Sequence, residues 1–272
     1  MASENALQDE SILHRAPVDQ GVLRLTFNDS ARRNALSDDM LDALAVALAD
    51  AEVDEAVRVI VLAATGPAFC AGHDLKEITR ARQSADGGRA FFMATFSACS
   101  AVMQAIVQHP KPVIAEVDGV ATAAGCQLVA SCDLAYASPR ARLAVPGVHI
   151  GLFCSTPMVA LSRNVSNKAA MEMLLTGALI DAERAVEIGL VNQVVDEASL
   201  TDHTMGIARE IATKSTMTLA TGKKAFYHQR ELPLADAYDY TSAVMVENLL
   251  KKDAEEGISA FIEKRPPQWS DQ

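Results

Sequence analysis

Short apolar runs alternate with helical patterns over the first 200 residues of the chain. The apolar runs predict buried strands at 22–27, 57–64, 112–117, 134–137 and 191–195. Between the first two, Ser37 is a good N-cap for a helix that has an apolar position every three or four residues up to Ala51. Strands that alternate with helices favour an α/β fold.

The pattern changes near residue 200, after which strand signals cease. Apolar positions from Ile207 to Phe261 have helical spacing, a polar break lies at 251–257, and Pro266-Pro267 ends the last helix. We therefore divide the chain into a core at 1–200 and a C-terminal helical region at 201–272.

Composition narrows the choice of function. Half of the 272 residues are hydrophobic and only 5% are aromatic, so the core is built from Ala, Val, Leu and Ile. A net charge of −11 argues against non-specific nucleic-acid binding, so no nucleic-acid partner is expected. An anionic cofactor such as coenzyme A remains compatible with this charge, because a few local cations can hold its phosphates.

The cysteines and the N-terminal segment bear on location. The five cysteines are odd in number and form no Cys-x-x-Cys pair, which indicates reduced thiols. The first twenty residues contain acidic side chains and no apolar leader. No apolar run approaches the length that spans a bilayer. We therefore expect a cytoplasmic protein without a membrane partner, and the scattered histidines lack the spacing of a metal site.

The most informative stretch is Ala121–Asp133, which follows the apolar run at 112–117. Its residues are small up to Gly125 and then take a helical pattern. Small residues let the backbone approach a ligand, and a helix that starts there points free N–H groups at it. A second loop of this kind lies at 69–76. Two such loops are typical of an enzyme that polarises a carbonyl group, and we expect that of a thioester.

At these residues the chain resembles the crotonase (enoyl-CoA hydratase/isomerase) family. The resemblance covers nearly the whole chain in family order, and two segments, 122–133 and 151–157, match one subgroup more narrowly. The matching motifs are Arg33–Leu36, Ala71–Leu75, Gly125-Cys126 with Cys132-Asp133, Leu175–Gly177, Ala185 with Gly189–Val191, and Ala260–Arg265.

The resemblance implies a fold, a ligand and an assembly. The fold is an α/β, crotonase-like spiral of ββα units followed by a C-terminal helical trimerisation region. The ligand is an acyl-CoA, with coenzyme A as part of the thioester substrate and no prosthetic group or metal. The assembly is a homotrimer or a dimer of trimers.

The resemblance also implies contacts for the ligand. The backbone N–H groups of His73 and Ala124 would form an oxyanion hole. The side chains of these residues would not take part in it. The alternative is that both loops are ordinary tight turns. The implied coenzyme A contacts are Arg33, Asn34, Ala35, Ala71, Gly72, Asp74, Leu75 and Gly125, with Phe261 and Lys264 at the adenine-phosphate end, from the same or a neighbouring subunit. For Lys264 the alternative is a solvated cation at a helix end.

The chain departs from the family at the reacting groups. Hydratases of this family use two glutamates, and the matching positions hold Gln127 and Gly147. Glutamine cannot exchange a proton near neutral pH, and glycine has no side chain. If residues 147–149 are extended, His149 points to the same side as Gly147 and is a speculative substitute; the alternative is an ordinary loop histidine. Cys154 is more simply explained as a buried inert thiol.

These observations indicate an acyl-CoA-binding enzyme of the hydratase/isomerase type, with ordinary hydration impaired by the lost glutamates. Two alternatives remain. One is a different acyl-CoA reaction, a hydrolysis or another isomerisation. The other is a catalytically inactive acyl-CoA-binding or regulatory protein. The sequence does not determine the acyl chain or the identity of a substitute acid or base.

Overall fold

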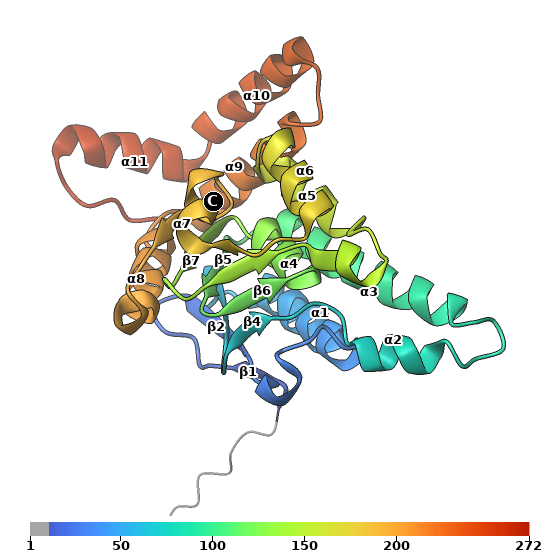
Figure 1. Ribbon diagram of the computed structural model, residues 1–272. Helices are drawn as coiled ribbons and strands as arrows, with labels where there is room; N and C mark the ends of the chain where they lie inside the picture. Colours follow the sequence, from blue (N-terminus) through green and yellow to red (C-terminus); the bar gives the residue numbers. More distant parts are fainter. Residues whose placement is uncertain (1–10, 272) are drawn as a thin grey trace, which may run out of the picture.

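The computed structural model describes residues 11–271, which form two sheets surrounded by helices (Figure 1). The larger sheet has the strand order β1-β2-β3-β5-β7-β10 and is parallel apart from the β1–β2 pair. Its strands are β1 (Leu13–Arg15), β2 (Val22–Phe27), β3 (Val59–Ala64), β5 (Val113–Val117), β7 (Leu134–Ala137) and β10 (Gln193–Val194).

The smaller sheet has the order β4-β6-β8-β9. Its strands are β4 (Ala68–Cys70), β6 (Val120–Thr122), β8 (Arg142–Ala144) and β9 (Ile180–Asp181). Three strands of the large sheet, β3, β5 and β7, are each followed by a short strand of this sheet and then by a helix. The helices are α2 (Leu75–Ala81), α4 (Ala124–Ser131) and α5 (Pro157–Asn164), respectively. This recurring ββα unit confirms the predicted α/β spiral.

Among the described residues, four helices lie in the first half of the chain, and three of them enclose the core on one side of the large sheet. They are α1 (Asp38–Val53), α3 (Arg89–Gln108) and α4 (Ala124–Ser131), with the short α2 (Leu75–Ala81) beside α3. Ser37 caps α1 as the sequence predicts, since its side chain accepts a hydrogen bond from the Met40 N–H. Three-residue 3₁₀ turns at Ser30–Arg32 and Glu197–Ser199 and a five-residue one at Pro146–Ile150 join these elements.

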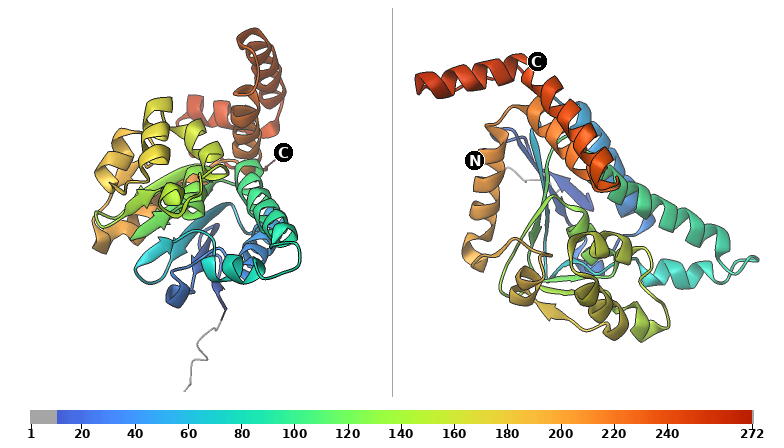
Figure 2. Two further views of the ribbon diagram at one scale, coloured as in Figure 1. Left: turned by 45° about the vertical axis from the view of Figure 1, so that its right-hand side comes forward. Right: turned by 90° about the horizontal axis from the view of Figure 1, so that it is seen from above.

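The later helices are α5 (Pro157–Asn164), α6 (Asn167–Thr176), α7 (Ala182–Glu187), α8 (Leu200–Ala212), α9 (Thr216–Gln229), α10 (Leu234–Leu249) and α11 (Lys252–Glu263). They do not form one unit. Helix α8 covers the other face of the large sheet through Leu200, Met205 and Ala208, and α9 packs on α3. Helices α10 and α11 project from the body in Figure 1, and α11 also does so in the view from above (Figure 2), where α10 overlies the body. The division at residue 200 stays a prediction, although α8 is packed as part of the core.

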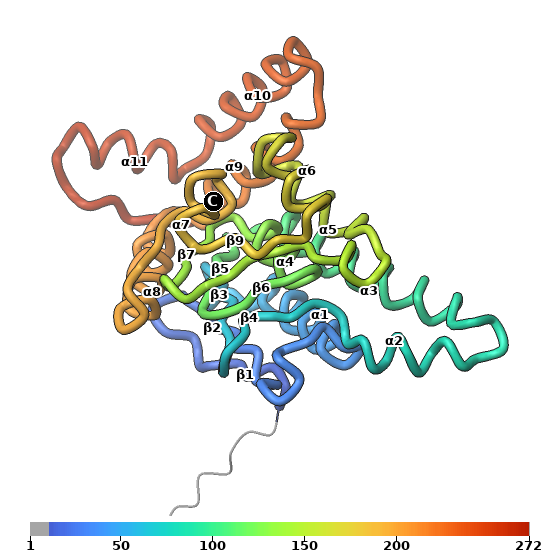
Figure 3. Tube along the Cα trace, viewed as in Figure 1, coloured from blue at the N-terminus to red at the C-terminus, as the bar shows by residue number. Residues whose placement is uncertain are grey.

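A buried ion pair fastens α9 to the sheet. The Lys223 ammonium lies 2.6 Å from Asp133 Oδ2, and that carboxylate also accepts from the Val113 N–H at 2.7 Å and the Tyr227 hydroxyl at 3.0 Å. Lys223 thus has a structural role. Asp133 immediately precedes β7, so this ion pair joins α9 to the start of a central strand. The tube trace shows the path of the chain through both elements (Figure 3).

The expectation that no apolar run approaches the length that spans a bilayer was wrong. Helix α3 has 20 residues and a mean hydropathy of 1.7, so by length and composition alone it could cross a bilayer. One such helix is weak evidence, because core helices of soluble proteins meet the same criterion. Its inner face packs on α1 and α4 through Cys99, Val102 and Ile106.

Candidate active site at the contact of two loops

The two small-residue loops of the sequence meet in space at Gly72. This residue has φ +92°, a conformation that favours glycine. A Cβ placed on it would lie 3.0 Å from the Ala123 Cβ, 3.1 Å from the Thr122 oxygen and 3.4 Å from the Ala124 nitrogen. The backbone that precedes α2 therefore touches the backbone that precedes α4, although the segments are about fifty residues apart.

Close contacts hold this junction in place. The Thr122 hydroxyl donates to the Ala71 carbonyl at 3.1 Å. Gly125 presses on β4 so closely that a Cβ on it would lie 2.0 Å from the Cys70 oxygen. Gly125 is thus required for packing, because any larger residue would push α4 away from β4. Its predicted role at a ligand stays a prediction.

The backbone N–H groups of His73 and Ala124 follow directly after this contact. Within residues 11–271, neither group donates a hydrogen bond. Ala124 is the first residue of α4, where a helix has no internal acceptor for its N–H. The preceding residue, Ala123, has φ 52° and ψ −117°, a strained backbone for a residue with a Cβ. The turn therefore leaves Ala124 N–H unpaired at the loop junction.

Gln127 occupies the first turn of α4 and is 4% exposed. Its backbone is part of the helix, but its side-chain Oε1 is buried and has no hydrogen-bond partner among the described residues. Buried polar atoms are normally paired, so an unpaired one next to the junction is a feature that needs a ligand or a water.

The second position of the family glutamates is filled in another way. Gly147 faces Cys154: its N–H donates to the Cys154 Sγ at 3.2 Å, and a Cβ on Gly147 would lie 2.9 Å from that sulfur. Burial raises the pKa of the Cys154 thiol, and the hydrogen bond from Gly147 partly opposes this. The thiol is therefore protonated at neutral pH, in line with an inert cysteine.

The expected orientation of His149 was wrong. Residues 146–150 form a 3₁₀ turn instead of an extended segment, so Gly147 and His149 do not share a side. The imidazole of His149 is exposed, and its Nε2 lies 3.2 Å from the carbonyl oxygen of Gly177 at the end of α6. The structure thus favours an ordinary loop histidine over a substitute base.

The segment Arg33–Ala35 runs beside the first loop, since the Ala71 N–H donates to the Arg33 oxygen and the Leu36 N–H to the Gly72 oxygen. Arg33 is exposed, with a left-handed backbone, and forms no ion pair with the described residues. The Asn34 amide instead has a structural role. It is fully buried and donates to the Thr65 and Ala68 oxygens, so both of its hydrogens are used.

Asp74 and Leu75 lie at the start of α2. Asp74 is the N-cap: its carboxylate accepts from the Lys76 N–H at 2.7 Å and is 3.6 Å from Arg32. Its side chain is thus committed to the helix. Leu75 is 54% exposed next to the junction, and Ala35 is buried.

Phe261 and Lys264 lie elsewhere. Phe261 is 85% exposed near the end of α11, and Lys264 follows that helix with a left-handed backbone. Helix α11 lies at the opposite end of the molecule from α2 (Figure 1). Within one protomer, this pair does not meet the residues around Arg33.

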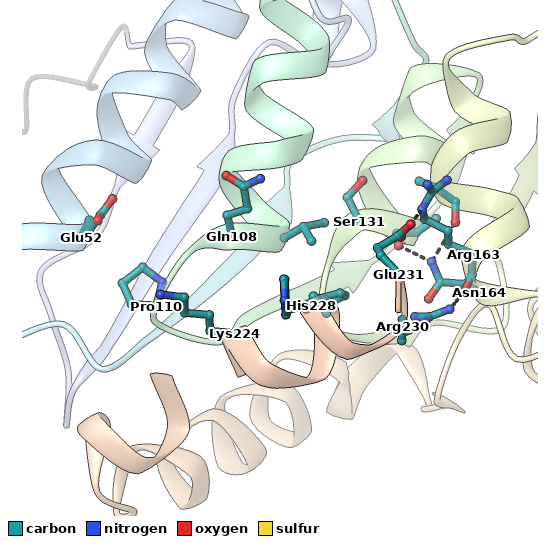
Figure 4. A pocket seen from close by; sticks show the side chains of 14 residues that line it. Glu52, Gln108, Pro110, Ser131, Arg163, Asn164, Lys224, His228, Arg230 and Glu231 are labelled. Atoms are coloured by element: carbon teal, nitrogen blue, oxygen red, sulfur yellow. Dashed lines mark hydrogen bonds and ion pairs between the residues drawn. The ribbon is translucent and has the colours of Figure 1, made fainter. Parts of the chain in front are cut away.

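Two hollows lie among the described residues. One, of about 330 Å³, lies at the start of α3 and is lined by Gly87, Arg89, Phe92, Met93 and Phe96. The other, of about 630 Å³, lies behind α4, where Lys224 and His228 of α9 face Gln108 and Ser131 (Figure 4). Residues at the C-terminal ends of α3, α4 and α5 line the second hollow, and neither loop of the junction does so. Among residues 11–271 there is no group of three or more His, Cys, Asp or Glu side chains suited to a metal ion.

Comparison with known proteins decides the family. The model of the enoyl-CoA hydratase/isomerase family matches residues 18–272. The chain belongs to this family. It is 49% identical over 251 residues to the human protein named enoyl-CoA hydratase domain-containing protein 3, mitochondrial. The match covers 92% of this chain and 81% of the human protein. The corresponding rat protein is 48% identical over 250 residues, covering 92% and 82%.

Solved structures agree. The crystal structure of an enoyl-CoA hydratase of Mycobacterium smegmatis has a TM-score of 0.90 at 48% identity and covers 96% of this chain and 99% of that one. The human enoyl-CoA hydratase domain-containing protein 3 gives 0.90 at 45% identity, with coverage of 95% and 100%. The narrower match of segments 122–133 and 151–157 to one crotonase subgroup is confirmed, and that subgroup is the group of domain-containing protein 3.

The names of the vertebrate relatives contradict the expected cytoplasmic location. The rat, mouse, human and frog proteins are all described as mitochondrial. The expectation rested on the unpaired cysteines and on an N-terminal segment with acidic side chains and no apolar leader.

Several features of the site were not predicted. The Thr122–Ala71 bond and the unpaired side-chain atoms of His73 and Gln127 depend on neighbours far away in the chain. The strain at Ala123 had no signal either, because alanine is ordinary at any helix start. Only the small size of residues 121–125 pointed to a tight approach.

Proposed function

We propose that this protein binds acyl-CoA thioesters and stabilises an enolate-like thioester oxygen with the backbone N–H groups of His73 and Ala124. The observation that carries the proposal is the contact at Gly72, which brings two unpaired N–H groups to one junction. Donors placed in advance where negative charge develops are the usual means of stabilising such an oxygen.

The chemistry after polarisation differs from that of an ordinary hydratase. The first glutamate position holds a buried neutral amide, and the second holds a glycine packed against Cys154. Proton-transfer groups typically contribute about 10²–10⁴-fold to rate. We therefore propose slow hydration, or another reaction of the thioester enolate, with acyl-CoA binding retained.

A second candidate is an acyl-CoA-binding protein without turnover. It is favoured by one observation, that a neutral amide and a glycine stand at the two glutamate positions. Turnover of crotonyl-CoA, 3-hydroxybutyryl-CoA or a simple acyl-CoA ester, measured beside binding, separates the two candidates. Binding with no turnover of any of them selects the second.

We also propose that coenzyme A lies along Arg33 and the first loop and that its phosphates meet Phe261 and Lys264 of a neighbouring subunit. The exposed cation of Arg33 supports the first part. The distance between α11 and α2 in one protomer supports the second (Figure 2).

Calorimetry with butyryl-CoA tests the oxyanion proposal through both loops. Ala124→Pro removes one N–H donor, and proline is tolerated at the first position of a helix. Gly72→Ala places a methyl group 3.4 Å from the Ala124 nitrogen. Both changes should weaken binding at least tenfold, whereas Gln127→Ala leaves both donors in place and should weaken it much less.

Circular dichroism must show that each variant is folded, because Ala123 has a backbone that a following proline disfavours. Equal affinities in wild type and all three folded variants would mean that the thioester carbonyl does not lie between these loops.

A further inference from the structure

The side chain of His73 has an unexplained polar atom. Its Nε2 is buried and has no hydrogen-bond partner among residues 11–271. The other ring nitrogen, Nδ1, lies 3.3 Å from the Leu36 carbonyl oxygen. A carbonyl oxygen can only accept, so Nδ1 carries the proton and the neutral ring presents Nε2 as a lone-pair acceptor.

Burial also lowers the pKa of His73, opposed by the hydrogen bond to Leu36 and by the charge of Asp38. The ring is therefore neutral near pH 7, and Nε2 remains an acceptor there. The lowered pKa agrees with the geometry, because the hydrogen bond to the Leu36 carbonyl oxygen already places the proton on Nδ1.

The ring lies between the junction and the hollow of α3. His73 follows Gly72, and its imidazole packs edge-to-face on Phe96 with ring centroids 5.1 Å apart. Phe96 in turn lines the hollow of about 330 Å³ with Phe92 and Met93. An acyl chain that leaves a thioester at the junction and enters this apolar hollow passes the imidazole.

A second acceptor lies near the same junction. Gln127 Oε1 is buried and unpaired, one helical turn after Ala124. A site with unpaired acceptors is matched by a ligand with a donor, because leaving such an acceptor unpaired costs binding. A plain hydrocarbon chain offers no donor.

We propose that the His73 imidazole determines specificity, its Nε2 accepting a hydrogen bond from a hydroxyl group on the acyl chain close to the thioester. The ligand class is thus a hydroxyacyl-CoA in preference to the unsubstituted acyl-CoA. The inference rests on the proposed function, since it requires the thioester at the junction. It assigns to the side chain a role that is separate from that of the backbone N–H.

Two substitutions separate the ring nitrogens. In His73→Gln the amide reaches the position of Nε2 and keeps an acceptor there. In His73→Asn the shorter amide reaches only the position of Nδ1, next to the Leu36 carbonyl. Both variants keep the backbone N–H of residue 73. His149→Asn is the matched control, since that imidazole contacts Gly177 and lies outside the junction.

The experiment measures the dissociation constants of 3-hydroxybutyryl-CoA and butyryl-CoA by calorimetry for each protein. We expect the wild type to prefer the hydroxy compound by about three- to tenfold, the equivalent of one neutral hydrogen bond. The preference should be kept in His73→Gln and His149→Asn and lost in His73→Asn.

The outcomes distinguish this inference from the proposed function. If neither compound binds the wild type, the proposed function fails and the inference with it. If butyryl-CoA binds and the hydroxy compound binds no better, the inference alone is overturned, and a buried water is the partner of Nε2. A preference that persists in His73→Asn also overturns it, because another group then binds the hydroxyl.

Discussion

The backbone N–H of Gly147 donates to the Cys154 Sγ at 3.2 Å, and a Cβ built on Gly147 would lie 2.9 Å from both that sulfur and the Leu152 oxygen. The position of the second family glutamate is therefore closed by the chain itself. Restoring a carboxylate there requires the loop at 152–154 to move, because the Leu152 oxygen is backbone and cannot rotate away.

We expect Gly147→Glu to lower the melting temperature, whereas Gln127→Glu exchanges side chains of nearly equal size. The sequence alone suggests that both substitutions together would restore hydration of crotonyl-CoA. The structure indicates that the double variant gains little over Gln127→Glu alone. Thermal melts and hydration rates of both single variants and the double variant check this. A stable double variant with a rate far above that of Gln127→Glu would show that the loop yields easily.

Five of the six strands of the large sheet could be predicted from the sequence, whereas β1 and the small sheet could not. The run at 59–64 is apolar throughout, since this strand is buried on both faces. The strands Ala68–Cys70, Val120–Thr122 and Arg142–Ala144 have three residues each, too few to show a period. They form only because parallel neighbours pair with them across the spiral.

Some features of the candidate site could also be predicted from the sequence, whereas others could not. The loop at 121–125 could be predicted because its residues are all small, and the missing glutamates were identified through the family resemblance. The direction of His149 and the use of the Asn34 amide inside the protein were not predictable, since both depend on partners about thirty residues away.

Ala123 provides a test of backbone strain at the junction. Its φ of 52° and ψ of −117° suit glycine far better than alanine. We expect Ala123→Gly to raise the free energy of unfolding by about 1 kcal/mol, the relief of strain exceeding the entropy that glycine adds to the unfolded chain. Chemical denaturation measures this change.

Ala121→Gly is the matched control two residues earlier. Ala121 is fully buried in β6 and has no positive φ, so glycine there should lower stability. If both glycine variants were destabilised alike, Ala123 would not be strained in solution.

His109 makes stability depend on pH. It is 3% exposed, its Nε2 lies 3.1 Å from the Leu48 oxygen, and its Nδ1 accepts from the Lys111 N–H at 3.1 Å. Burial lowers its pKa below the ordinary 6.5, and the charge of Lys223 adds to this. The unfolded chain then binds a proton at a higher pH than the folded one, so stability is present above about pH 6.5 and lost as the pH falls below it.

We expect the free energy of unfolding to fall between pH 7 and pH 5, with His109 contributing at most about 1.4 kcal/mol per pH unit. In His109→Gln, which cannot titrate, the slope should be smaller. The remaining slope includes His73, whose pKa burial also lowers. Urea denaturation at several pH values gives both slopes, and parallel slopes would contradict a neutral buried His109.

The projecting helices indicate an assembly. Large apolar side chains of α10, α11 and the turn between them lie in solvent in the single chain, with Leu250 75%, Phe261 85% and Ile262 73% exposed. Monomeric proteins rarely expose such continuous apolar surface, so a second copy is expected to cover it. Light scattering at micromolar concentration should give the mass of a trimer or of a dimer of trimers.

Variants on this surface connect assembly with ligand binding. Phe261→Asp with Ile262→Asp should reduce the mass toward that of a monomer, because a charge at an apolar interface is costly to bury. Val53→Asp is the control: Val53 is 80% exposed at the end of α1, away from α11. If Phe261 and Lys264 of a neighbour contact the coenzyme A phosphates, the dissociated double variant should also bind butyryl-CoA more weakly than the control. A wild type that is monomeric at micromolar concentration would refute the assembly and would remove Lys264 from the coenzyme A site, because α11 does not reach α2 within one chain.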